Sequence, residues 1–256
     1  MRIFSWLYLA LIFGFIFLPV VVLVLFSFQD SRLPIPPFDG PTLKWYVKVI
    51  GDRDLMAALA NSLIVSLISA AVALILGFLA AQGLSRIHLP GSAVMRGLLI
   101  APLTVSYLII ALGLLSVFNS IGIRPSLWAT GIGHVVINLP LCFAIIFAAM
   151  GDHQKNAERA ARDLGASDIN VMLLVTAPML MPALLAAYFL SVTFSWDEFI
   201  IAFLLTRFEV TLPVEIWSML RSGLSPATNA IGSLVFLVSV ALLFLLEFTL
   251  FRKSKS

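Results

Sequence analysis

The chain has 256 residues, of which 61% are hydrophobic and only 11% are charged, and its mean hydropathy is +1.07. Because soluble domains carry about 25% charged residues, this composition excludes a water-soluble globule and predicts an integral membrane protein. The net charge of +3 comes from dispersed residues, and no Lys/Arg cluster is long enough to follow a nucleic-acid backbone, so nucleic acid is not an expected partner.

Six apolar stretches are each long enough to cross a hydrocarbon core of about 30 Å, which takes about 20 helical residues. None alternates apolar and polar residues as a barrel strand would, so all six are expected to be helices. The first is too long for a signal peptide and lacks a cleavage pattern, so we expect it to be retained. The sequence predicts an all-α membrane protein with one transmembrane domain, residues 1–256, and spans at about 3–28, 55–84, 97–118, 128–150, 179–205 and 228–250.

The distribution of Lys and Arg predicts the orientation of these spans. Residues 85–96 and the C-terminal tail are basic and contain no acidic residue, whereas residues 119–127 carry only Arg124. The long segment 29–54 holds four basic and four acidic residues. We therefore expect a multi-pass protein with both termini in the cytoplasm.

The segment 29–54 is rich in proline and then becomes amphipathic at Thr42–Tyr46. Trp45 and Tyr46 are residue types that suit the membrane–water interface. Two interpretations stay open: an interfacial anchor helix, or a docking surface for a partner on the outer side.

A short charged segment lies between the fourth and fifth stretches, at about residues 152–172. Asn156 is placed to cap a first short helix, with Glu158 in its favourable first turn. Ala160 and Ala161 would give that helix a small, flat face, and Gly165 supplies a left-handed stop. We predict a helix–turn–helix along the cytoplasmic face, which either fits a partner's groove or is an ordinary polar loop.

This segment resembles the EAA loop of ABC-transporter permease subunits, whose pattern is E-A-A-x3-G-x9-I-x-L-P. Ala160, Ala161 and Gly165 match the pattern, and Pro178 falls at the required distance. Three positions depart from the pattern: Arg159 stands where the motif Glu is usual, Val175 replaces Ile and Ala177 replaces Leu. The resemblance implies a coupling helix that inserts into a cleft of an ATPase subunit and transmits its closure. The coupling residues that it implies are Glu158, Arg159, Ala160, Ala161 and Gly165.

Six spans with such a loop between the fourth and fifth resemble the permeases of binding-protein-dependent importers, which implies a type I ABC importer bundle in a bacterial cytoplasmic (inner) membrane. Residues 42–46 with 61–62, residues 194–199, and residues 211–226 with 229–230 are similar to spermidine/putrescine permeases of the PotC type. No Walker A pattern occurs in the sequence. The resemblance therefore implies that ATP and Mg bind to two separate ATPase subunits and that this chain holds no cofactor. It also implies a second permease subunit, expected to be a different chain, and an extracytoplasmic substrate-binding protein.

Asp197 and Glu198 lie within the fifth predicted span, where a charged side chain costs about 3 kcal/mol even on a lenient scale. We expect them near the outer end of a continuous helix, facing a cavity or a partner. Successive helical residues point about 100° apart, so one acid can meet the pathway while the other ties helices together. Attraction of a cationic amine by carboxylate and aromatic groups and a buried anchor both stay open. The candidate pathway residues are Phe194, Ser195, Trp196, Asp197 and Glu198.

The remaining polar residues of the spans are expected to have structural roles. Cys142 is the only cysteine and lies in an apolar run, so we expect a packed thiol and no disulfide. His134 and Asn138 lie one turn apart in the fourth span and are expected to hydrogen-bond between helices rather than to relay protons. The sequence contains no H-E-x-x-H or G-x-S-x-G pattern and no metal-ligand spacing, so we predict no catalytic residue and no metal site.

The function expected from these features is that of a permease subunit of an ATP-driven importer. It would form half of an alternating-access pathway for a polyamine or a related organic amine. One alternative is an importer permease for a sugar, a phosphonate or another small organic solute. A second is an ion-coupled secondary transporter, which would work without ATP. An intramembrane enzyme is disfavoured because its motifs are missing.

Overall fold

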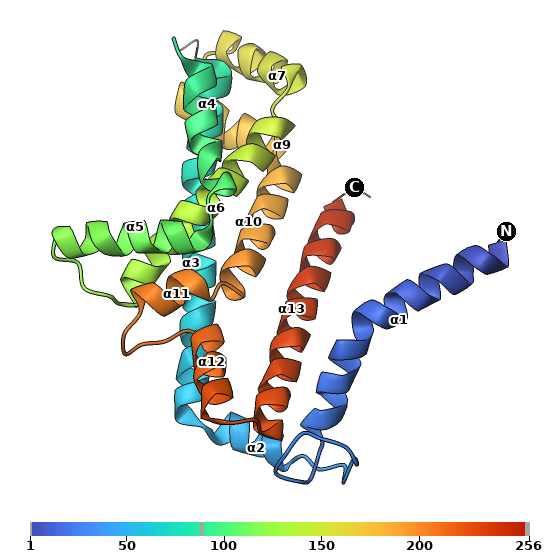
Figure 1. Cartoon of the computed structure of the whole chain (residues 1–256). Helices are drawn as coiled ribbons and strands as arrows, with labels where there is room; N and C mark the ends of the chain where they lie inside the picture. Colours follow the sequence, from blue (N-terminus) through green and yellow to red (C-terminus); the bar gives the residue numbers. More distant parts are fainter. Residues whose placement is uncertain (1, 88–89, 254–256) are drawn as a thin grey trace. The chain divides into compact units, whose positions relative to one another are not determined.

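The computed structural model describes residues 2–87 and 90–253 (Figure 1). Over these residues the chain is largely helical and contains no strand, which confirms the predicted all-α fold. The helices, with one 3₁₀ turn (η1) and one π-helical turn (η2), are α1 (Arg2–Ser27), α2 (Lys44–Gly51), α3 (Arg53–Arg86), α4 (Ser92–Ile100), η1 (Ala101–Thr104), α5 (Tyr107–Ser120), α6 (Leu127–Ala149), α7 (Asp152–Asp163), α8 (Asp168–Val171), η2 (Met172–Thr176), α9 (Ala177–Met179), α10 (Met181–Trp196), α11 (Ile200–Leu205), α12 (Leu212–Ser222) and α13 (Pro226–Lys253).

The chain forms two compact units. The first takes the residues up to Ala58 together with Val214–Ala241, and the second takes Leu59–Pro213 together with the residues from Leu242 on. Within the second unit, α4, α7 and α9 lie at the same end (Figure 1). Both predicted functional segments, the charged loop and the region around Asp197, therefore belong to the second unit.

Three described helical segments are long and apolar enough to cross a membrane, namely Phe4–Ser27, Arg53–Arg86 and Leu127–Ala149. Two bent helix pairs raise this number to five if each pair is one span. Within α13, the continuously described part Pro226–Ala241 is an apolar helix shorter than a full span. The predicted number of six spans therefore stays a prediction.

The third and fifth predicted stretches are not straight helices. The third bends by 106° between Ser92–Thr104 and Tyr107–Ser120. Pro102 lies in the tight 3₁₀ turn, and the next residue after that turn, Val105, is extended; an extended residue cannot continue a helix. A second bend, of 76°, separates Asp168–Met179 from Met181–Trp196.

The core of the second unit depends on close contact between α3 and α6. A Cβ atom added to Gly77 of α3 would lie 2.8 Å from Cys142 Cβ and 2.9 Å from Phe143 N. Cys142 and Phe143 are fully buried, which confirms that Cys142 is a packed thiol. A second close contact joins Gly133 of α6 to Ile201 of α11. Small residues at these positions let the helices approach closely.

In the first unit, a buried glutamine organises the loop between α1 and α2. The Gln29 side-chain amide donates to the carbonyl groups of Ile35 and Pro37, and its oxygen accepts from the Asp39 backbone N–H. Trp45 Nε1 donates to the Gln29 carbonyl at 2.6 Å, which fixes the start of α2 against this loop. Tyr46 Oη lies 2.7 Å from Ser27 Oγ, so both members of the aromatic pair that the sequence singles out are hydrogen-bonded inside the unit.

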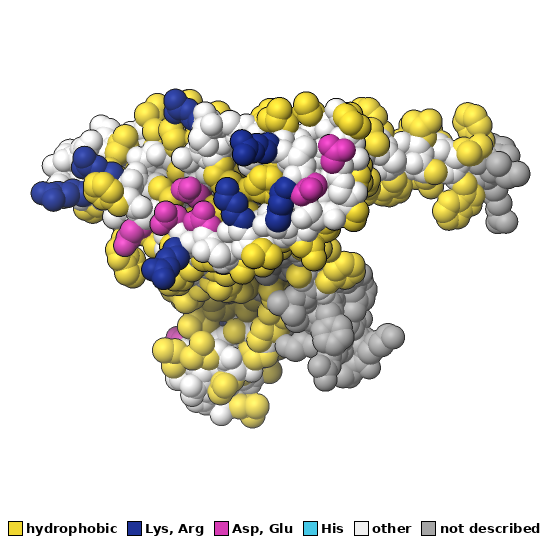
Figure 2. All heavy atoms as spheres, turned by 90° about the horizontal axis from the view of Figure 1, so that it is seen from below, with side chains coloured by type: hydrophobic (Ala, Val, Ile, Leu, Met, Phe, Trp, Pro, Cys, Tyr) yellow, Lys and Arg dark blue, Asp and Glu magenta, His cyan; other side chains and the backbone are white. Residues whose placement is uncertain are grey.

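The surface has the character expected in a bilayer. Side chains along α1 are apolar and exposed, including Phe4, Leu11 and Phe15. Figure 2 shows charged side chains together with many hydrophobic ones on the face that it draws. Continuous exposed apolar surface of this kind is unfavourable in water and favourable in lipid.

Candidate functional site

The charged loop forms a helix–turn–helix. α7 ends at Asp163, and Gly165 follows with a φ of +87°. The Gly165 N–H donates to the Arg162 carbonyl at 2.8 Å, and the Ala166 N–H donates to the Ala161 carbonyl at 3.0 Å. This is a left-handed helix stop, so the backbone conformation requires glycine at this turn. Nothing lies within 4 Å of a Cβ added at Gly165, so glycine is required here by the positive φ and not by crowding from neighbouring atoms.

The start of α7 differs from the prediction. The helix begins at Asp152, and Gly151 is its N-cap residue. Asn156 therefore lies inside the helix and does not cap it. The Gly151 backbone N–H donates to Gln154 Oε1 at 3.0 Å, because a glutamine at the third helical position can reach back to the cap.

Glu158 is the buried centre of the segment. Its side chain is fully buried, and Oε2 accepts from Arg86 Nε at 2.7 Å. Oε1 accepts from Arg86 Nη2 at 3.1 Å and from Thr176 Oγ1 at 2.9 Å. Arg86 is the last residue of α3, and Thr176 is the last residue of η2. One carboxylate therefore joins three elements, and Glu158 cannot itself touch a partner.

The other predicted coupling residues divide between two sides of α7. Arg159 and Ala160 are exposed, whereas Ala161 is half-buried. Leu164, which the sequence analysis did not select, is 89% exposed beside Gly165. An isolated leucine in an otherwise polar turn is the signal that could have found it. Ala160 and Leu164 form the surface available to a partner, which we call the free face of α7.

The region around Asp197 and Glu198 is a break between two helices, which corrects the prediction of a continuous helix. α10 ends at Trp196, and α11 begins at Ile200. Glu198 is buried, and its carboxylate accepts the backbone N–H groups of Ile200 and Ile201 at 2.9 Å and of Ala202 at 3.2 Å. These are the donors that a new helix leaves unsatisfied at its first turn. Glu198 therefore stabilises the start of α11.

A buried polar network surrounds the Glu198 carboxylate. His134 Nδ1 hydrogen-bonds Ser195 Oγ, and Ser195 Oγ lies 3.1 Å from Ser69 Oγ. His134 Nε2 lies 3.5 Å from Glu198 Oε2. The network links α3, α6 and α10, which confirms His134 as an interhelical hydrogen-bonding group. Ser195 and Glu198 thus belong to the helix packing rather than to a surface.

Two of the five predicted pathway residues are exposed. Asp197 is exposed, and Phe194, three residues earlier, is 52% exposed. Trp196 is 2% exposed, and its indole N–H has no hydrogen-bond partner among the described residues. Asp197 and Phe194 are therefore the pair that can present a carboxylate and an aromatic ring to a ligand.

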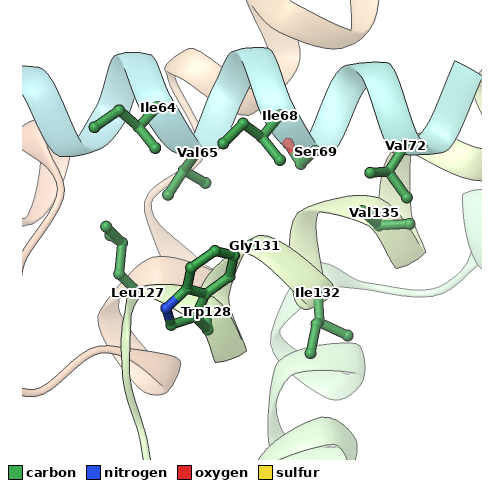
Figure 3. Close-up of a pocket in the computed structure, with 10 residues that line it drawn as sticks. All are labelled: Ile64, Val65, Ile68, Ser69, Val72, Leu127, Trp128, Gly131, Ile132 and Val135. Atoms are coloured by element: carbon green, nitrogen blue, oxygen red, sulfur yellow. The ribbon is translucent and has the colours of Figure 1, made fainter.

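An apolar pocket of 210 Å³ lies between α3 and α6 (Figure 3). Ile68 and Val72 line it from α3, and Trp128 and Ile132 line it from α6. Its polar lining residue Ser69 is hydrogen-bonded to Ser195. No charged side chain lines this pocket, so it offers no counter-ion to a cationic solute.

In the first unit, three acidic residues lie close together: Asp52 between α2 and α3, Asp54 of α3 and Glu215 of α12. A cavity of 350 Å³ has Asp52, Glu215 and Lys48 among its lining residues. Burial raises the pKa of Glu215, and the carboxylates of Asp54 and Asp52 raise it further. Among the described residues, no group of three or more His, Cys, Asp or Glu could hold a metal ion.

Comparisons with known proteins place the chain among membrane transport subunits. No family model matches it. It is 32% identical to the putrescine permease PotI of Escherichia coli (strain K12), covering 90% of this chain and 85% of PotI. It is 29% identical to the spermidine/putrescine permease PotC of the same strain, covering 92% of this chain and 89% of PotC.

Solved structures show the same fold at lower identity. A chain of a bacterial alginate ABC transporter, solved with a periplasmic protein bound to an alginate pentasaccharide, matches with a TM-score of 0.73 at 15% identity. The match covers 100% of this chain and 96% of that one. A chain of an amino acid ABC transporter matches with a TM-score of 0.61 at 16% identity, covering 82% of this chain and 99% of that one.

Proposed function

Because the chain belongs to the family of ABC importer permease subunits that contains PotC and PotI, we propose that it forms half of the membrane pathway for a polyamine or a related organic amine. Its proposed partners are a second, different permease chain, two ATPase subunits and an extracytoplasmic substrate-binding protein. ATP and Mg would bind on the ATPase subunits. The proposed orientation, in a bacterial inner membrane, has both termini and α7 in the cytoplasm.

The observation that carries this proposal is the buried connection beneath α7. Glu158 connects α7 to the end of α3 through Arg86 and to η2 through Thr176. η2 is followed directly by α9 and then by α10. A force applied to the free face of α7 would therefore reach a membrane-spanning helix and the start of α10 together. This is what an ATP-driven change between inward- and outward-facing states requires.

A cationic solute is supported by two features. The named relatives PotC and PotI are permeases for spermidine or putrescine. In this chain, the exposed Asp197 follows the end of α10 at the helix break, three residues after the half-exposed Phe194. A carboxylate attracts an ammonium group by charge, and an aromatic face attracts it through its quadrupole.

Uptake into vesicles that contain the reconstituted transporter with its binding protein tests the proposal. We expect labelled putrescine or spermidine to enter only with ATP, and Asp197→Asn to weaken uptake at low substrate by about tenfold, the scale of one charge-assisted contact. Glu209→Gln, which neutralises another exposed carboxylate of the same unit, should leave uptake unchanged. Uptake of a sugar but of no amine would favour the alternative function, that of an importer permease for a sugar. Uptake that needs no ATP and is abolished by a protonophore would select a secondary transporter.

A further inference from the structure

A cavity of 590 Å³ lies beside α7, between the last turn of α3 and the segment α8–η2. It is separate from the free face: Lys155, Arg159 and Arg162 line it, at spacings of four and three residues that share one side of α7. Ala160 and Leu164 do not line it. We call this cavity the basic pocket.

The basic pocket has an excess of positive charge. It is lined by four basic side chains and two acidic ones. Both acidic groups already have partners: Glu158 binds Arg86, and Asp168 Oδ1 accepts from Arg162 Nε at 2.9 Å. Lys155 and Arg159 form no ion pair within the described part of the chain. Two cations are therefore available to an anionic ligand.

The same pocket has an apolar side. Ile87, Ile169 and Met172 are among its lining residues, and the first two are more than half exposed. Leu173, next to Met172 on η2, is also more than half exposed. A phosphate ion or an acidic side chain would leave these apolar groups uncovered, whereas an amphiphile would cover them and meet the cations together.

The position of the pocket fits a lipid. Arg86, which lines it, ends a helix that is long and apolar enough to span a membrane. The end of such a helix lies at the depth of the lipid headgroups. We propose that the basic pocket binds an anionic phospholipid, with its phosphate between Lys155 and Arg159 and an acyl chain along Ile169 and Leu173. This rests on the proposed function in placing α7 at the cytoplasmic surface, where basic pockets meet anionic headgroups.

Binding to the full-length chain, purified in detergent and observed by native mass spectrometry, tests this proposal. The probes are phosphatidylglycerol, phosphatidylcholine and inorganic phosphate. We expect phosphatidylglycerol to bind at least about tenfold more tightly than phosphatidylcholine. The double variant Lys155→Gln/Arg159→Gln should lose that preference, and Lys155→Gln alone should lose part of it. The matched control Arg124→Gln/Arg207→Gln removes two exposed charges elsewhere in the same unit and should retain the preference.

Three results would overturn the proposal. One is equal binding of the two lipids, and another is full competition by inorganic phosphate alone, which would make the pocket a site for free anions. The third is a Lys155→Gln/Arg159→Gln variant that keeps its preference for phosphatidylglycerol. If that variant also no longer retains the ATPase subunit in the assembled transporter, the pocket belongs to that partner. Because lipid binding is read on the isolated chain, failure of polyamine uptake would not affect this test.

Discussion

Glu158 and Glu198 are buried carboxylates whose partners lie inside the chain. Glu158 is held by Arg86 and Thr176, and Glu198 by three backbone N–H groups at the start of α11. Charges in such places are tolerated only when their hydrogen-bonding capacity is used. Both residues therefore hold elements in place, and of the two acidic residues at the helix break only Asp197 is exposed.

The ion pair between Glu158 and Arg86 gives the first prediction. Glu158→Gln leaves the largely buried Arg86 guanidinium without its counter-charge, and we expect it to lower the free energy of unfolding by about 3 kcal/mol. The double variant Glu158→Gln/Arg86→Gln removes both charges and should be clearly more stable than Glu158→Gln. Thermal unfolding of the purified chain in detergent measures both. A double variant as unstable as the sum of the two single variants would show that the pair is not coupled.

Glu215 gives a prediction about pH. Burial, followed by the carboxylates of Asp54 and Asp52, raises its pKa in the folded state. The folded chain then binds more protons than the unfolded chain, so its contribution to stability is complete below the unfolded value of about 4.3 and is lost as pH rises through the raised pKa. We expect Glu215→Gln to reduce the loss of thermal stability between about pH 4 and pH 7. An unchanged slope of melting temperature against pH would contradict this.

At these positions the sequence identified the residue types but not their roles. It placed Glu158 in the charged loop and Glu198 in an apolar stretch. It could not pair Glu158 with Arg86, because these residues are 72 positions apart and only the packing of α7 on the end of α3 brings them together. The exposure of Leu164 likewise depends on which side of α7 the unit covers.

At the scale of helices, apolar stretches were predictable and their interruptions were not. The break at residues 197–199 lies inside a stretch of high hydropathy, so composition does not reveal it. Glu198 makes the break possible because its carboxylate supplies the acceptors that the first turn of α11 needs. A charged residue in an apolar stretch can therefore mark a helix start as well as a ligand site.

Glycines could not be sorted from the sequence either: eight of them lie within the predicted spans, and only some of these lie at helix contacts. A Cβ at Gly77 would lie 2.8 Å from Cys142 Cβ, whereas nothing lies within 4 Å of a Cβ at Gly113. We expect Gly77→Ala to force α3 and α6 apart and to destabilise the chain by about 1–3 kcal/mol. Gly113→Ala, in α5, should be neutral or slightly stabilising because alanine favours helix. Thermal unfolding measures the melting temperature of each variant. Equal melting temperatures for Gly77→Ala and Gly113→Ala would contradict the close contact between Gly77 and Cys142.

At the scale of the whole chain, hydropathy was sufficient to identify the class of protein. An all-α membrane protein followed from composition and apolar stretches, and the charged loop pointed to the ABC importer permeases, to which the chain belongs. The number of spans, the orientation and the partners depend on the bilayer and on other chains. Such properties are set by interactions outside this molecule, so they stay predictions.

The central claim is that the free face of α7 contacts an ATPase subunit on the cytoplasmic side. Cys142 is the only cysteine and is buried, so a photo-crosslinker on the new thiol of Ala160→Cys reports on that face alone. In the assembled transporter we expect Ala160→Cys to cross-link to the ATPase subunit, and Ile121→Cys, in the exposed turn after α5, to give no such product. Labelling of Ala160→Cys only from the outer side of the membrane, or equal cross-linking from both positions, would contradict the account.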